Sequence, residues 1–110
     1  MKANYIQAGE NIDYINETDK EVEAGDVILF GERIGIAGGN MAVGQLGALH
    51  MNGVFELEKA AGTAITAGAP VYYNAADDVI TTTKTNNILA GYAVAAAAAD
   101  AATVLVAVNA

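Results

Sequence analysis

Short apolar runs separated by glycine and charged residues recur along the whole chain. The clearest pair, 27–30 and 33–37, flanks the dipeptide Gly31-Glu32. A two-residue loop that begins with glycine is typical of a type II′ β-hairpin, because glycine adopts positive φ without steric cost. The pattern therefore predicts two antiparallel strands joined by a tight turn.

Strand alternation divides this predicted hairpin into two faces. In the register that the turn sets, one face carries four apolar side chains and no polar one: Val27, Leu29, Ile34 and Ile36. We expect this face to contact the core. The other face mixes Ile28 and Phe30 with polar residues, and we expect it to be half-buried where subunits meet.

Further strands are predicted where β-branched and aromatic residues concentrate. They lie at 11–16, 42–49, 53–59, 71–73, 79–85, 88–94 and 103–108. The pair 79–85 and 88–94 reads as a second hairpin about Asn86-Asn87, because asparagine tolerates the left-handed conformation of a type I′ loop. The alanine-rich run 93–102 is too short for a stable helix by itself, so we expect a turn or a short helix there.

Short strands at regular spacing, joined by glycine turns, indicate an all-β fold: a small single-domain sandwich or barrel with at most one short helix. We expect the domain to span residues 11–110. Residues 1–10 show no period, and we expect an extended N-terminal arm with Tyr5 and Ile6 as its apolar contacts. A frayed terminus is the alternative that the sequence leaves open.

Two segments of the chain resemble each other. Residues 22–28 and 65–72 both read apolar, polar, Ala-Gly, strand, with one extra residue before the second strand. This is either an internal duplication or the same turn chemistry used twice, and two copies do not decide between them.

The charge balance excludes several classes of partner. The formal net charge is −8, and the five basic residues are scattered along the chain. Phosphate recognition needs clustered lysine and arginine, so neither nucleic acid nor an anionic membrane is an expected partner. The longest stretch without a charged residue, 34–55, is too polar and too rich in glycine for a membrane span. We therefore expect a soluble protein.

No pattern in the sequence predicts a catalytic, metal or cofactor site. The chain has no cysteine and a single histidine, His50, which is expected to be structural. Four carboxylates lie in residues 17–23, but they lack the spacing of a calcium loop and are expected to be solvated. The adjacent pair Asp77 and Asp78 is also expected to lie in a solvated loop. Phosphate-loop glycine patterns are absent.

Several short segments together resemble a known family. They are Asn4-Tyr5-Ile6-Gln7-x-Gly9, Ala24-Gly25-Asp26-Val27, Gly53-Val54-Phe55-Glu56-Leu57-x-Lys59-Ala60, Gly68-x-x-Val71-Tyr72, Leu89-Ala90-Gly91-Tyr92-Ala93 and Ala102-Thr103-Val104. Their order is similar to that in the capsid cement or decoration proteins of phage heads, once filed as a domain of unknown function. The resemblance covers nearly the whole chain, and none of its pieces is a catalytic signature.

The resemblance implies a structural virion protein, without enzymatic activity or cofactor, that binds the outer surface of a phage capsid and stabilises it as a trimer. Its implied partners are the major capsid protein and further copies of itself, and it would assemble in the host bacterial cytoplasm. An N-terminal arm often supplies the shell contact in such proteins. The arm residues that match the family pattern, and are the expected capsid-binding residues, are Asn4, Tyr5, Ile6 and Gln7.

The expected subunit-interface residues are apolar or aromatic strand residues: Ile28, Phe30, Tyr72 and Tyr73. Two alternatives stay open at this point. One is another virion component, such as a tail or fibre protein. The other is a small β module that binds a ligand at a cluster of Tyr72, Tyr73 and Tyr92.

Overall fold

The computed structural model describes residues 1–5 and 9–110, which form two antiparallel sheets and no helix. The first sheet contains β1 (Asn11–Ile15), β2 (Val27–Phe30), β3 (Arg33–Ala37) and β4 (Leu46–His50), in the order β1-β4-β3-β2. The second contains β5 (Gly53–Glu58), β6 (Pro70–Asn74), β7 (Val79–Thr81), β8 (Ile88–Ala93) and β9 (Thr103–Val108), in the order β5-β9-β8-β6-β7. The predicted all-β class is confirmed.

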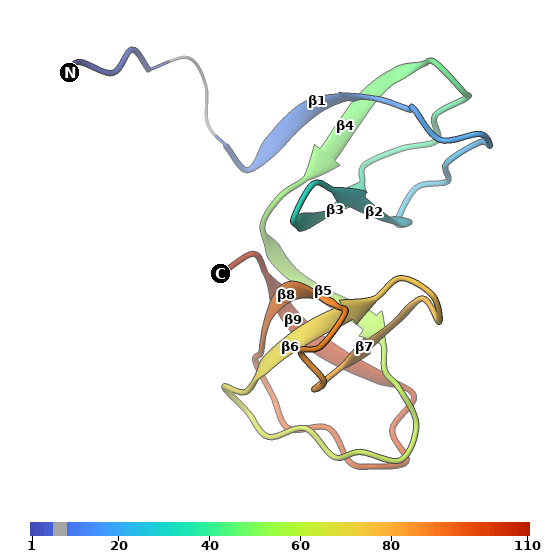
Figure 1. Cartoon of the computed structure of the whole chain (residues 1–110), viewed down its shortest axis with the longest axis vertical. Helices are drawn as coiled ribbons and strands as arrows, with labels where there is room; N and C mark the ends of the chain where they lie inside the picture. Colours follow the sequence, from blue (N-terminus) through green and yellow to red (C-terminus); the bar gives the residue numbers. More distant parts are fainter. Residues whose placement is uncertain (6–8) are drawn as a thin grey trace.

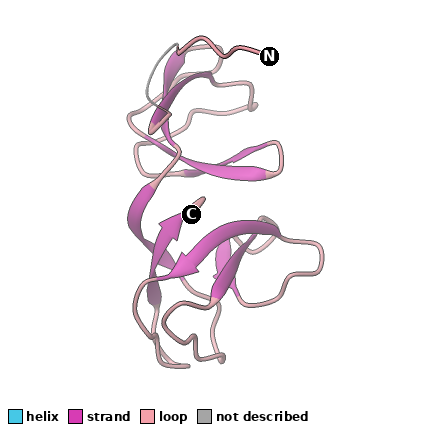
Figure 2. Cartoon of the chain, turned by 90° about the vertical axis from the view of Figure 1, so that its left-hand side faces the viewer, coloured by secondary structure: helices cyan, strands magenta, loops and turns pink. Residues whose placement is uncertain are grey.

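The two sheets lie one above the other along the longest axis of the molecule (Figures 1 and 2). The chain completes the first sheet before it enters the second, and β4 leads directly into β5. The residues on either side of this step, 11–51 and 53–108, are called the first half and the second half below. Residues 1–5 form no strand and are exposed.

The predicted hairpin forms in the predicted register, with Val27 opposite Ile36 and Phe30 opposite Arg33. Gly31 has a φ of 62°, as a type II′ turn requires, and Glu32 does not adopt positive φ. Both faces of the hairpin contribute residues to a buried cluster. Ile34 and Ile36 are buried toward the second sheet, whereas Ile28 is buried in a cluster within the first half.

The second predicted hairpin is wrong. Strand β7 ends at Thr81 and pairs with β6, and β8 pairs with β6 and β9, so β6 lies between the two supposed partners. Residues 82–87 form a loop that crosses from one side of β6 to the other, and Asn86 adopts positive φ within it. The alanine-rich run forms turns and an isolated bridge between Ala97 and Ile65, without a helix.

The two halves repeat one arrangement of strands. Strands β1, β2, β3 and β4 correspond to β5, β6, β8 and β9, and these occur in the same order in their sheets. The cross-strand pairs agree as well: Ile36 opposite His50 corresponds to Tyr92 opposite Ala107. Among the described residues, β7 has no counterpart in the first half.

The loops repeat along with the strands. The Gly25 N–H donates to the Ala37 carbonyl (2.8 Å), and the Gly68 N–H donates to the Ala93 carbonyl (2.7 Å). The two glycines have φ values of 88° and 83°. Val71, like Ile28, lies three residues after its glycine and is buried, so the second segment holds no extra residue before its strand. The resemblance between residues 22–28 and 65–71 is therefore a structural repeat.

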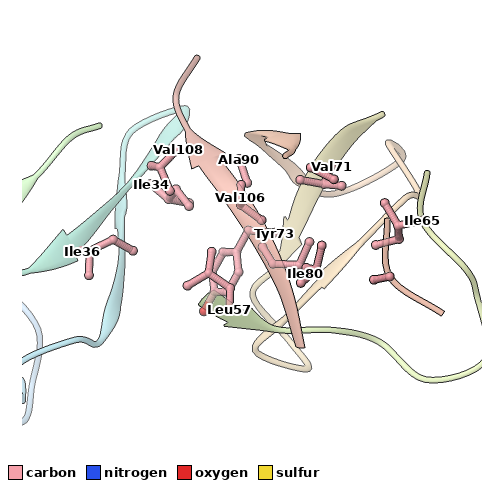
Figure 3. Close-up of a cluster of buried hydrophobic side chains, with 13 residues drawn as sticks. Ile34, Ile36, Leu57, Ile65, Val71, Tyr73, Ile80, Ala90, Val106 and Val108 are labelled. Atoms are coloured by element: carbon pink, nitrogen blue, oxygen red, sulfur yellow. The ribbon is translucent and has the colours of Figure 1, made fainter. Parts of the chain in front are cut away.

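Each half has an equivalent inner core. The first-half cluster consists of Ile12, Tyr14, Val22, Ile28, Ala37, Met41, Leu49 and Met51. Each has a counterpart in an inner core of the second half, made of Phe55, Leu57, Ile65, Val71, Ala93, Ala97, Val106 and Val108. The second-half cluster also takes in Ile34 and Ile36 of the first half (Figure 3), which joins the two sheets.

Candidate interaction surfaces

Two buried polar residues hold the loops at corresponding places in the two halves. Asn16 follows β1 and is 1% exposed, and Lys59 follows β5 and is 6% exposed. The Asn16 Nδ2 donates to the carbonyls of Lys20 (2.9 Å) and Met41 (3.0 Å). The Lys59 Nζ donates to the carbonyls of Ala60 (2.8 Å) and Ala99 (3.1 Å). These contacts satisfy buried polar groups and organise the chain, so we assign both residues a structural role.

Tyr73 carries a buried phenol that is hydrogen-bonded to a carboxylate. Burial raises the pKa of its hydroxyl well above the usual range, and the hydrogen bond to Asp78 acts in the same direction. The Tyr73 hydroxyl donates to the Asp78 Oδ1 at 2.6 Å. The raised pKa keeps the phenol un-ionised in alkaline solution as well as at neutral pH, and its hydrogen bond to Asp78 supports the fold.

The remaining polar residues that the sequence singled out do not form a reactive centre. The His50 ring is partly buried between the Asn11 side chain, which it contacts through Nδ1, and the ring of Phe55, 6.0 Å away. Asp77 is exposed in the turn after β6. Within residues 1–5 and 9–110, no three histidine, aspartate or glutamate side chains are grouped as a metal site. The described part also contains no helix of the length and hydropathy that would cross a membrane.

The four predicted interface residues lie in two different environments. Ile28 and Tyr73 are 8% and 6% exposed and belong to the buried clusters of their own chain. Phe30 is 42% exposed and Tyr72 is half-buried on the outer face of β6. A second copy of the chain therefore has access to Phe30 and Tyr72, and their role in a subunit contact stays a prediction.

The predicted arm residues are described in part. Asn4 and Tyr5 are exposed and form no strand, and Tyr5 is 85% exposed. Ile6 and Gln7 lie outside the described residues. An exposed tyrosine at the start of the chain is available to a partner, and its use in capsid binding stays a prediction.

The structure also exposes large apolar side chains, most of which the sequence analysis did not assign. Leu29, which was expected to contact the core, is 47% exposed. At the end of the first sheet the exposed side chains are Ile15, Leu29 and Leu46, and on the second sheet they are Val54, Leu89, Tyr92, Val94 and Leu105. Strand alternation places some of these on predicted outer faces, but only the packing of the two halves shows which faces are left uncovered. Exposed apolar surface of this extent is typical of protein–protein contacts.

Comparison with protein families resolves what kind of protein carries these surfaces. The family model described as "Phage cement protein" matches residues 6–108. The chain belongs to the phage cement protein family. Membership indicates a structural role in association with the phage capsid. Neither a curated protein nor a solved structure matches this cement protein.

Proposed function

We propose that this cement protein binds the outer surface of a phage capsid as a homotrimer and stabilises the shell without catalysing a reaction. The family match over residues 6–108 is the observation that carries the proposal. The surfaces described above support it, because they are apolar patches on sheets and not a polar cleft around reactive side chains.

The arm supplies the proposed capsid contact. Residues 1–5 are exposed and make no strand pairing within the chain, so their backbone donors and acceptors are available to a partner. Addition of an extended segment to a sheet edge satisfies those groups and gives an ordered contact. In this proposal Asn4, Tyr5, Ile6 and Gln7 add to an edge presented by the major capsid protein.

A trimer strengthens such a contact through multivalency. A single arm of a few residues buries little surface, but once one arm of a trimer is bound the other two bind intramolecularly, which raises avidity by about 10²–10⁴. A trimer carries three times the formal charge of −8. This charge favours solubility and opposes adherence to packaged DNA.

The direct test is binding to expanded empty capsids of the parent phage, measured by co-sedimentation. The full chain is expected to bind stoichiometrically and to raise the temperature at which the capsids rupture. A variant without residues 1–10 is expected to lose binding while it keeps its fold and its oligomeric mass. Unchanged binding of that variant would contradict the role of the arm alone, whereas no binding of the full chain would contradict decoration and favour another virion component.

A further inference from the structure

In the contact between the two halves, an apolar face of the first half packs against one end of the second half, where Leu57 and Tyr73 lie. The face is the outer side of β2 and β3, which presents Val27, Leu29, Ile34 and Ile36. Ile34 and Ile36 are 0% and 3% exposed, and they belong to the same buried cluster as Leu57, Tyr73 and Val108 of the second half (Figure 3). The Asn109 Nδ2 fixes this contact by donating to the Ile34 carbonyl at 2.8 Å.

The second half carries an equivalent apolar face, and its two β8 residues are exposed where the corresponding residues of β3 are buried. Its members, which we call the outer quartet, are Pro70, Tyr72, Leu89 and Tyr92. Tyr92 lies opposite Pro70 as Ile36 lies opposite Val27, and Leu89 lies opposite Tyr72 as Ile34 lies opposite Leu29. Leu89 is 50% exposed and Tyr92 is 41% exposed. Like its counterpart, the outer quartet has no charged member.

The first half has an end that corresponds to the Leu57 and Tyr73 end of the second half. In the second half, a hollow of about 270 Å³ is lined by Glu56, Leu57, Glu58 and Tyr73, and its other wall is Gly25, Asp26 and Val27 of the first half. The corresponding residues of the first half are Asp13, Tyr14, Ile15 and Phe30. They line a second hollow of about 500 Å³, together with Glu17, Leu29, Gly31 and Leu46. No residue of the second half lines this open hollow.

We propose that the outer quartet of one chain docks in the open hollow of the next, so that copies of the cement protein associate head to tail. The occupant is a second copy, because each surface repeats one side of a contact that the chain already makes within itself. The sizes agree at Tyr92, which takes the place of the buried Ile36, because the open hollow is the larger of the two. Leu29, the counterpart of Tyr72, is 47% exposed and itself lines the open hollow. This hollow is larger in part because the first half has no strand that corresponds to β7.

A head-to-tail contact uses two different surfaces, so it either closes into a ring or continues as a filament. A closed ring of three chains would place six four-stranded units around one axis. The inference thus deepens the trimer of the proposed function by naming its surfaces, and it does not depend on capsid binding. Carboxylates do not oppose it, because the internal contact tolerates Glu56 and Glu58 in its hollow, and the open hollow is likewise lined by two carboxylates, Asp13 and Glu17.

Chemical cross-linking tests the two surfaces directly, because the chain has no cysteine. Pro70→Cys and Phe30→Cys are prepared separately, and a short bis-maleimide is added to each protein alone and to their mixture. The proposal expects a covalent dimer in the mixture and monomer in each separate sample. A double variant is expected to give higher species. Dimers in the separate samples and none of the mixed product would overturn the head-to-tail arrangement.

Oligomeric mass provides an independent measurement that does not need cross-linking. Tyr92→Glu is expected to reduce the mass of the assembly to that of one chain, 11.2 kDa. Leu105→Glu is the matched control, because Leu105 is 40% exposed on the neighbouring strand and its counterpart Ala48 is not in the internal contact. Circular dichroism confirms that both variants fold. A monomeric wild-type chain, or equal masses of the two variants, would overturn the inference and leave capsid association untouched.

Discussion

The first and second halves of the chain share a strand order, a loop pattern and an inner core, but their outer faces differ in solvent exposure. In the first half, Ile36 on the outer face of β3 is 3% exposed, whereas Tyr92 at the corresponding place on β8 is 41% exposed. At the other end of each unit the relation is reversed: Tyr73 is 6% exposed and its counterpart Phe30 is 42% exposed. Each half therefore lacks one contact that the other half has.

This difference separates residues that fold the chain from residues that remain available to partners. Positions at which both halves are buried, such as Ile28 and Val71, belong to the fold of each unit. Where only one of two equivalent residues is buried, as in the two pairs above, the buried one lies in the contact between the halves. Pairs of equivalent substitutions can therefore test the comparison, because the local environment within each unit is nearly the same.

The largest expected difference concerns the glycine at the centre of each unit, Gly91 or Gly35. Gly91 has a φ of 147°, and a Cβ there would lie 1.9 Å from the Ala107 carbonyl oxygen, which belongs to the backbone of a paired strand. At Gly35 the nearest atoms are side-chain atoms of Leu49, at 3.0 Å, which can move. Gly91→Ala should lower the free energy of unfolding by about 3 kcal/mol or more, and Gly35→Ala by about 1–2 kcal/mol. Urea unfolding measures both, and equal losses would contradict the comparison.

The contact between halves predicts the next difference. Ile36→Ala removes a fully buried side chain and should cost about 2–5 kcal/mol. Tyr92→Ala, at the equivalent exposed position, should change the stability of the isolated chain by about 0.5 kcal/mol. Thermal unfolding at a concentration where the chain is monomeric is the appropriate measurement. A large effect of Tyr92→Ala in the monomer would show that the outer face of β8 is covered within the chain.

The buried polar pair should give a smaller and unequal effect. Asn16→Ala removes two donated hydrogen bonds and two accepted ones, from the Thr18 N–H (3.0 Å) and the Thr18 hydroxyl (2.6 Å), which should cost about 2 kcal/mol. Lys59→Met keeps the length of the stem, and the carbonyls that it leaves can be hydrated because Ala99 is exposed and Ala60 partly so. Its cost should be about 1 kcal/mol. Chemical denaturation of the two variants checks the order, and a larger loss for Lys59→Met would refute it.

Tyr73→Phe should have a small effect at neutral pH, about 1 kcal/mol for one hydrogen bond. The pKa of Tyr73 is raised in the folded chain, and that of an unfolded tyrosine is about 10. Above pH 10 only the unfolded state releases this proton, so the stability that the neutral phenol contributes is lost as the pH rises. Tyr73→Phe should therefore lose less stability than the wild type between pH 9 and pH 11.

Stability curves at several pH values between these limits measure that difference. Tyr5→Phe is a suitable control, because Tyr5 is 85% exposed and lies outside the strands. Parallel curves for the wild type and Tyr73→Phe would show that the buried phenol does not contribute to the pH dependence.

The sequence predicted structure well wherever the signal is local. The hairpin 27–37 was predicted with its turn and register, because Gly31-Glu32 determines both within two residues. The pairing of β7 was not predicted, because Asn86-Asn87 looks like a hairpin loop although β6 lies between β7 and β8. Pairing between strands that are not consecutive depends on the whole sheet, and short-range patterns do not contain it.

The sequence did not show which of the predicted interface residues are exposed, because neighbouring residues of a strand point to opposite faces. Tyr72 and Tyr73 are adjacent and chemically alike, so they point to opposite faces of β6, and composition does not reveal which face is inside. The same holds for Ile28 beside Leu29. The repeat decides between the two faces of β6. Ile28 is buried and corresponds to Val71, so Val71 lies in the core and its neighbour Tyr72 lies on the opposite face. The two copies of the Ala-Gly turn were visible in the sequence, but their strand register was not.

The bridge made by Asn109 has a consequence for how the protein is made. Its side chain donates to the carbonyls of Ile34 and Met51 from a position directly after β9. During synthesis, the first half can leave the ribosome and pair its strands before β9 exists. Its apolar face, with Ile34 and Ile36, then stays exposed until β9 and Asn109 have been made and can close the contact between the halves.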